Sequence, residues 1–181
     1  MIYLIGGVAR AGKTSIMKRL LSDYKIPGLE TDSLRTMFEL SLPELKIHYQ
    51  NLSEDNALRM EPFIKAFIES RFFFDYDFVL EGDCITPEVA RVYGNNRLVK
   101  SLFLGYPNIL LEKKIKQLVE NPEGWTKGLS DYDLKEKIEL FIKQSRLLRE
   151  SCDKANLSFI DTSDLDIEGV VSAALINFNL K

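Results

Sequence analysis

The sequence contains few of the residues that build metal clusters or disulfide frameworks. Its 181 residues include two cysteines, Cys84 and Cys152, and a single histidine, His48. The cysteines lie far apart and show no CxxC spacing, so we expect two reduced, buried thiols in a reducing compartment. One histidine and two cysteines do not form a recognisable zinc site. The composition therefore excludes a disulfide-stapled secreted domain and a structural zinc module.

Positive charge is also in short supply. The chain has 24 Lys and Arg against 27 Asp and Glu, a net charge of −3. General nucleic-acid binders and binders of anionic membranes need an excess of positive surface, so we expect neither kind of partner. The apolar start breaks at glycine after five residues and is too short for a signal peptide or a membrane span. We expect a cytoplasmic protein, as a monomer or homodimer.

Short apolar runs alternate with longer amphipathic stretches along the chain. Runs typical of buried strands occupy residues 2–5, 77–81, 98–104 and 157–161, with a weaker one around 26–31. Helical patterns fill the intervals. Buried strands separated by helices predict parallel βαβ units with helices on both faces of the sheet. We therefore expect one α/β domain over residues 1–181, a three-layer sandwich with a five-stranded parallel sheet.

Two stretches depart from the simple alternation of strand and helix. Residues 33–74 are mostly helical, with interruptions at Pro43 and near Asn51. Residues 121–130 have turn-forming residues without periodicity and are expected to form a loop. A long helix should then run from Ser130 to about residue 155.

A phosphate-binding motif follows the first apolar run. Residues 7–14 match G-x-x-x-x-G-K-S/T between a buried strand and an amphipathic helix, the context that the motif requires. Gly7 and Gly12 allow close approach of the backbone, whose N–H groups point at the phosphates. Lys13 should bridge the β- and γ-phosphates, and the Thr14 hydroxyl should bind Mg²⁺. The residues expected to bind the nucleotide are Gly7, Ala9, Arg10, Ala11, Gly12, Lys13, Thr14 and Ser15. Arg10 either leans over the nucleotide or is a solvated loop residue.

Other signatures narrow the class of P-loop protein. We find neither the N-K-x-D and D-x-x-G motifs of a GTPase nor the paired acidic residues of a motor ATPase. The third apolar run instead ends in Glu81-Gly82-Asp83. This arrangement resembles the small-metabolite and nucleotide kinases of the P-loop class, such as adenylate, shikimate, gluconate and 2-phosphoglycerate kinases. The resemblance extends thinly over nearly the whole chain, with the P-loop as its one specific motif. It implies ATP and Mg²⁺ as cofactors.

The resemblance also implies an acceptor site after the second strand. Asp32 would orient the acceptor hydroxyl or accept its proton, and Arg35 would bind a carboxylate or phosphate on the acceptor. The alternative is that Asp32 caps a helix and Arg35 pairs on the surface. At the end of the third strand, Asp83 is assigned to the substrate and Glu81 to the metal, although these roles could be exchanged. Arg91 is a further candidate for the acceptor, although surface charge explains it nearly as well.

By the same resemblance, residues 33–74 form the acceptor pocket and residues 121–130 form a lid. A lid of this class brings cations over the transferring phosphoryl group. Arg146 and Arg149 lie one helical turn apart, share a face and are assigned to this role. Lys113, Lys114 and Lys127 are further candidates. A solvated charged helix is the alternative for any one of these residues.

The sequence departs from the adenylate-type pattern at one informative point. Those kinases continue their acidic strand end as Gly-hydrophobe-Pro-Arg, whereas this chain has Gly82-Asp83-Cys84-Ile85. A nucleoside monophosphate acceptor is therefore not expected. The leading hypothesis is an ATP-dependent phosphotransferase that acts on a hydroxyl of a small, anionic metabolite. The alternatives are a non-kinase nucleotide-binding regulatory or assembly protein and a toxin-like kinase of a nucleotide sugar.

Overall fold

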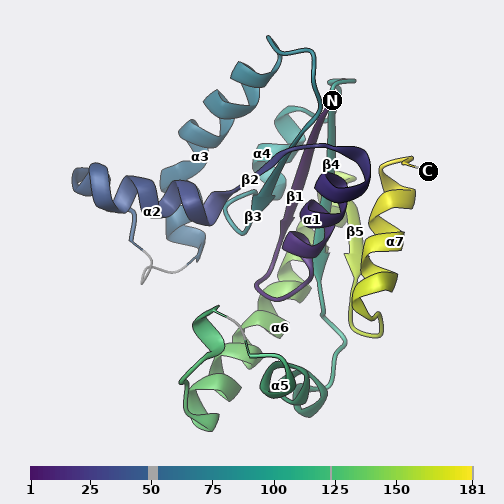
Figure 1. Cartoon of the computed structure of the whole chain (residues 1–181). Helices are drawn as coiled ribbons and strands as arrows, with labels where there is room; N and C mark the ends of the chain where they lie inside the picture. Colours follow the sequence, from purple (N-terminus) through teal and green to yellow (C-terminus); the bar gives the residue numbers. More distant parts are fainter. Residues whose placement is uncertain (49–52, 123, 181) are drawn as a thin grey trace.

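The computed structural model describes residues 1–48, 53–122 and 124–180. In these residues five strands form one parallel sheet in the order β2-β3-β1-β4-β5 (Figure 1). The predicted fold class is confirmed. The strands are β1 (Ile2–Gly7), β2 (Gly28–Glu30), β3 (Phe78–Gly82), β4 (Val99–Gly105) and β5 (Ser158–Asp161).

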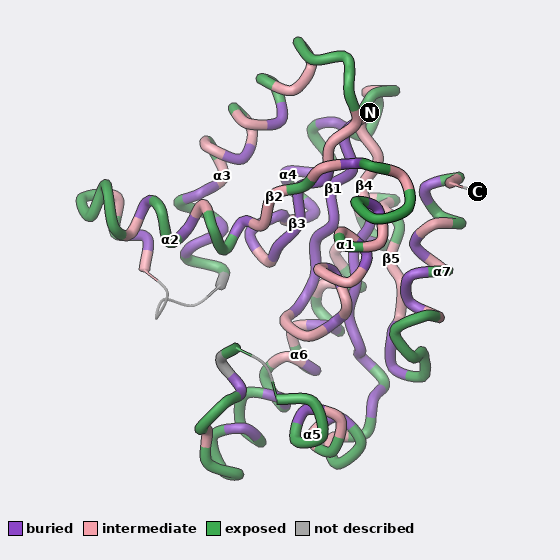
Figure 2. The backbone as a smooth tube through the Cα atoms, viewed as in Figure 1, coloured by how far each residue is buried: buried purple, intermediate pink, exposed green. Residues whose placement is uncertain are grey.

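Helices cover both faces of the sheet. Tyr3 and Ile5 of β1 point into the core under α1 (Lys13–Tyr24) and α7 (Ile167–Asn177). Ile2 and Leu4 point into the opposite core under α3 (Ser53–Arg71) and α4 (Pro87–Val92). The central strands are therefore buried on both sides (Figure 2). This burial explains why they read as continuous apolar runs rather than as alternating ones.

Two further helices complete the layers. They are α5 (Leu111–Glu120) and α6 (Asp131–Ala155), which follow β4 and contact each other. The segment between them, predicted to be a lid loop, contains the short 3₁₀ turn η2 (Gly124–Thr126), and residue 123 lies outside the described residues. None of the described helices is both long and apolar enough to cross a membrane.

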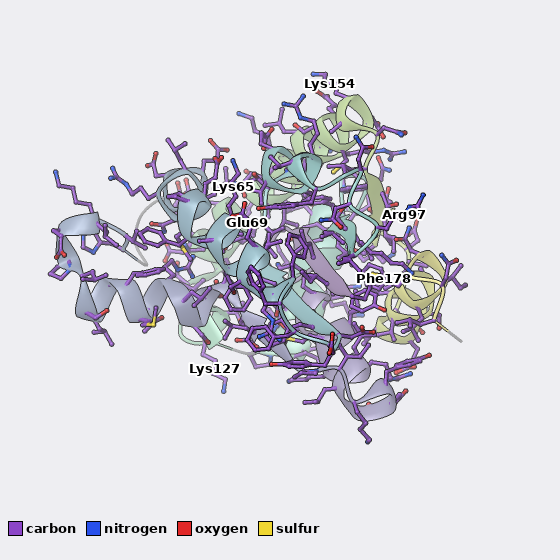
Figure 3. All side chains as sticks on the ribbon, turned by 90° about the horizontal axis from the view of Figure 1, so that it is seen from above. Lys65, Glu69, Arg97, Lys127, Lys154 and Phe178 are labelled. Atoms are coloured by element: carbon purple, nitrogen blue, oxygen red, sulfur yellow. The ribbon has the colours of Figure 1, made fainter. Side chains whose placement is uncertain are left out.

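The predicted acceptor region consists of α2 (Thr31–Ser41), the 3₁₀ turn η1 (Pro43–Leu45) and α3. The break at Pro43 is confirmed, whereas the one near Asn51 lies outside the described residues. Tyr93, which follows α4, connects α3 to the body through contacts of 3.3 Å from its hydroxyl to the Lys65 carbonyl and to a carboxylate oxygen of Glu69. Lys65 and Glu69 lie one turn apart on α3 (Figure 3).

The pairing of the strands places the functional residues at one edge. Gly6 of β1 lies opposite Gly82 of β3, and Glu30 at the end of β2 lies opposite Glu81. The chain therefore leaves all three strands at the same edge of the sheet. In open parallel sheets this carboxyl edge is where ligands bind.

Candidate active site

The P-loop requires glycine at both glycine positions of its motif. Gly7 ends β1 with φ +141°, and a Cβ there would lie 2.2 Å from the Leu104 carbonyl oxygen of β4. Gly12 precedes α1 with φ +103°, a region that L side chains rarely adopt. Gly12 has no side chain that could cap α1, so the N–H groups of the first turn remain available to an anion. The loop therefore fits a phosphate group.

Lys13 and Thr14 begin α1 inside the site. Lys13 is 9% exposed, and its ammonium group donates hydrogen bonds to the carbonyls of Gly7 (3.0 Å) and Val8 (2.9 Å). The Thr14 hydroxyl donates to a carboxylate oxygen of Glu81 at 2.6 Å. The structure thus brings together the lysine predicted to bind phosphate and the two residues predicted to bind metal.

Glu81 is an unusually buried carboxylate, with 3% of its surface exposed. Burial raises its pKa, while the Lys13 ammonium and the Thr14 hydroxyl oppose that effect. No three described His, Cys, Asp or Glu side chains form a metal site of their own. Thr14 and Glu81 nevertheless present the oxygen donors that Mg²⁺ prefers, and Mg²⁺ in kinases is completed by phosphate and water. These two residues fit the ion.

Gly82 lets the start of α2 pass close to the end of β3. Its φ is +151°, and a Cβ there would lie 1.7 Å from the hydroxyl oxygen of Thr31. Any side chain would therefore displace α2. The glycine between Glu81 and Asp83 thus keeps the end of β3 and the start of α2 in contact.

The predicted acceptor residues form one cluster. The Arg35 side chain is 7% exposed and lies between two carboxylates, 3.0 Å from Asp32 and 3.6 Å from Asp83. The alternative interpretation is wrong on both points: Glu30, not Asp32, precedes α2 as its N-cap, and Arg35 is not on the surface. Partial desolvation and the Asp83 carboxylate raise the pKa of Asp32, and Arg35 and Lys13 oppose that rise.

A cleft of about 790 Å³ joins this cluster to the P-loop. Its walls come from the P-loop, α2, the start of α3, the β3–α4 loop, the start of α4 and α6. Of the predicted site residues, it is lined by Gly7, Ala9, Asp32, Arg35 and Asp83. The donor side and the predicted acceptor side therefore face one space.

Comparisons with known proteins agree with this geometry. No protein-family model matches the chain, and no curated protein matches its sequence. Solved structures do match over nearly the full length. A shikimate kinase from Bacteroides thetaiotaomicron is 16% identical with a TM-score of 0.61, covering 99% of each chain. A sugar kinase from Janibacter sp. is 15% identical with a TM-score of 0.65, covering 99% of this chain and 94% of its own. A gluconokinase from Sinorhizobium meliloti is 14% identical with a TM-score of 0.58, covering 98% and 90%.

The chain has the fold of the P-loop kinases.

Within this P-loop kinase fold, the arginines predicted to serve the lid are engaged elsewhere. The Arg146 guanidinium donates to the Pro107 carbonyl at 3.0 Å, and Arg149 lies 3.5 Å from Asp161 at the end of β5. Neither lines the cleft. Arg91 is exposed and lines not the cleft but an adjoining depression of about 210 Å³ beside Lys154. Lys127 of the lid segment is exposed and extends away from the body (Figure 3).

Sequence reasoning missed the residues of α6 that do face the cleft. They recur every three or four residues and include Lys137, Leu140, Gln144, Leu147 and Ser151. Their periodicity was visible in the sequence, but only contact with the P-loop kinase core shows which face of a long amphipathic helix is inside. Lys137 is therefore the cation that α6 brings to the cleft, in place of Arg146 and Arg149.

The P-loop is also supported from behind. The Tyr106 hydroxyl donates to the Ala9 carbonyl at 2.8 Å, and the Lys114 ammonium donates to the Arg10 carbonyl at 2.9 Å. Arg10, at φ +60°, reaches the Asn121 carbonyl at 2.8 Å. Arg10 thus connects the P-loop to the end of α5, which neither sequence interpretation anticipated. Lys114 is a buried support rather than a lid cation, and Lys113 binds Ser163 and Asp164.

Lys114 predicts a measurable pH dependence of stability. Burial, with a contribution from Arg10, lowers its pKa from 10.5 to about 8. Between these values the unfolded chain holds the proton and the folded chain does not, so the free energy of unfolding should rise with pH. From neutral to strongly alkaline pH, the free energy of unfolding of the wild type should rise by up to about 3 kcal/mol relative to that of Lys114→Met.

Urea unfolding of the wild type and of Lys114→Met, from neutral to strongly alkaline pH, measures this rise in the free energy of unfolding. Lys116→Met, a substitution at a lysine of the same helix that is 77% exposed, is the control and should show no such trend. A difference between wild type and Lys114→Met that does not change with pH would contradict the proposed burial of the charge.

Proposed function

We propose that this chain is an ATP-dependent phosphotransferase that moves the γ-phosphoryl group onto a hydroxyl of a small molecule. The observation that carries the proposal is the shared cleft: the P-loop residues Gly7 and Ala9 and the carboxylate of Asp32 line one space. A phosphoryl donor and an alcohol acceptor must meet within a few ångströms for in-line transfer. The similar solved structures are those of kinases, which supports the same class of reaction.

Each residue has a defined task in the proposed reaction. Lys13 and the N–H groups of the P-loop bind the donor phosphates, and Thr14 and Glu81 hold Mg²⁺, which neutralises phosphate charge when bound. Asp32 orients the acceptor hydroxyl and takes its proton. The acceptor oxygen forms a bond to the γ-phosphorus as the bond from that phosphorus to ADP breaks. The raised pKa of Asp32 suits a group that accepts a proton.

Arg35 contributes to positioning. Its guanidinium lies between Asp32 and Asp83, and two carboxylates already offset its single charge. It therefore holds Asp32 in place and keeps its proton-accepting form available. The expected grip on an anionic acceptor is not supported by this arrangement.

The test is a screen of hydroxylated metabolites with ATP labelled at the γ-phosphate. A phosphotransferase transfers label to a particular alcohol faster than to water. Slow hydrolysis with no transfer across a broad panel would favour the nucleotide-binding regulator instead. The Asp32→Asn variant, tested on any acceptor found, separates transfer in this cleft from background hydrolysis.

A further inference from the structure

We infer that the acceptor is an amphipathic amino alcohol: a molecule with an apolar body and a protonated amine beside the hydroxyl. The inference rests on the proposed phosphotransferase activity and names its substrate class. It contradicts the anionic acceptor expected from the sequence. The charge balance of the cleft, its apolar wall and its volume carry it.

Charge is the first argument. The ionisable side chains that line the cleft are four carboxylates (Asp32, Glu54, Asp83 and Glu88) and two cations (Arg35 and Lys137). Arg35 is already balanced by Asp32 and Asp83. The described lining therefore has an excess of negative charge, and residues 49–52, outside the description, include no Lys or Arg. Away from the P-loop, such a lining attracts cationic groups of an acceptor and repels its carboxylates.

The second argument is the apolar wall of α6. Leu140 and Leu147 are seven residues apart on one helical face and are 43% and 50% exposed, respectively. Phe141 and Leu148 extend the same wall, and Ile85 lies on the β3–α4 loop. Exposed leucines on an interior cleft are costly in water, and burial against an apolar ligand removes that cost. A small, fully hydroxylated sugar acid would leave this wall unused.

Size is the third argument. The cleft of about 790 Å³ lies in the upper part of the range for ligand sites, so it has room for an acceptor of appreciable size beside the donor phosphates at the P-loop. The carboxylates Asp32 and Asp83 lie at its P-loop side, and Leu140, Leu147 and the other apolar residues come from α6. An acceptor with its hydroxyl at Asp32, its amine near the remaining carboxylates and its apolar group along α6 satisfies all three features.

Three matched alcohols test the inference by direct binding. They share the form HOCH₂–CHX–CH₂–phenyl and differ in X alone: an ammonium group, a hydroxyl or a carboxylate. Calorimetry with the full chain should show the amine binding at least about tenfold more tightly than the carboxylate, with the diol between them. The amine analogue with methyl in place of benzyl should bind about tenfold more weakly. Added salt should weaken the preference for the amine.

Substitutions in the lining test whether the preference for the amine and the binding of the benzyl group arise in the cleft. Glu54→Gln combined with Glu88→Gln should reduce the preference for the amine severalfold, whereas Glu44→Gln, an exposed change on η1, should leave it unchanged. Leu147→Ser should weaken binding of the benzyl compound by about three- to tenfold. Ile176→Ser is the matched control, because Ile176 is 75% exposed on α7 and outside the cleft.

The outcomes separate this inference from the proposed function. Tighter binding of the carboxylate, equal affinity for all three compounds, or no binding of any at millimolar concentration would overturn the inference. Label transfer to an anionic sugar acid or a nucleotide sugar would overturn it and leave the phosphotransferase standing. If the amine is preferred in binding but no alcohol is phosphorylated, the proposed function fails and the amphipathic, cation-selective cleft remains.

Discussion

Substituting methionine for Lys13 should lower the rate of phosphoryl transfer by about 100- to 1,000-fold while the chain stays folded. Methionine keeps the apolar stem, which is buried at the start of α1, and removes the ammonium group. In the proposed reaction that group binds the donor phosphates. In the free protein it donates to the carbonyls of Gly7 and Val8. The measurement is transfer of labelled phosphate at saturating acceptor.

Lys18→Met is the matched control, since Lys18 is an exposed lysine of the same helix. It should keep wild-type turnover and nucleotide affinity. Circular dichroism of both variants separates lost chemistry from lost structure. Turnover of Lys13→Met within a few fold of the wild type would falsify the assignment of the P-loop as the donor site.

Substituting asparagine for Asp32 should lower turnover by about 100- to 10,000-fold, the range of general acid–base catalysis. Asparagine keeps the shape of the side chain and cannot take the hydroxyl proton. Affinity for ATP should stay within about twofold, because an interaction made in the transition state contributes to turnover and not to donor binding.

Because the pKa of Asp32 is raised, wild-type activity should fall on acidification at a pH above the usual carboxyl range. The dependence of kcat on pH measures this fall in activity on the acidic side.

Asp131→Asn serves as control for Asp32→Asn. Asp131 lies in the first turn of α6, as Asp32 lies in the first turn of α2, but it is exposed and outside the cleft. It should leave turnover unchanged. A loss of ATP affinity equal to the loss of turnover in Asp32→Asn would instead point to a structural role through Arg35.

The donor side of the site was predictable because its chemistry is local. The P-loop motif lies within eight consecutive residues, and glycine torsions and a helix N-terminus follow directly from their order. The residues at the end of β3 were also predictable from the sequence, since Glu81-Gly82-Asp83 follows a recognisable buried apolar run. Strand boundaries differed from prediction by one or two residues. The assignment of Asp32 and Arg35 to an acceptor site rested on the resemblance to P-loop kinases.

The cations of α6 were not predictable in the same way. Arg146 and Arg149 share a face, as their spacing required, but the helix is rotated so that they contact Pro107 and Asp161. The face that lines the cleft carries Lys137 and a row of leucines. Periodicity defines the faces of a helix, whereas packing against β4 and α5 selects the one that points inward. The support of Tyr106 and Lys114 behind the P-loop is likewise a long-range contact.

The sequence by itself determined the α/β fold, the phosphate loop and the carboxylates at the ends of the strands. These features depend on burial patterns and on residues close together in the chain. Only the tertiary structure decided the character of the cleft, because its charge balance and apolar wall come from α2, α3, the β3–α4 loop, α4 and α6 together. Arg35 illustrates the difference: from the sequence it is a candidate to bind an anionic acceptor, and in the fold its charge is already matched by Asp32 and Asp83. A net charge in a cleft is a sum over distant residues, and only the fold specifies which residues enter that sum.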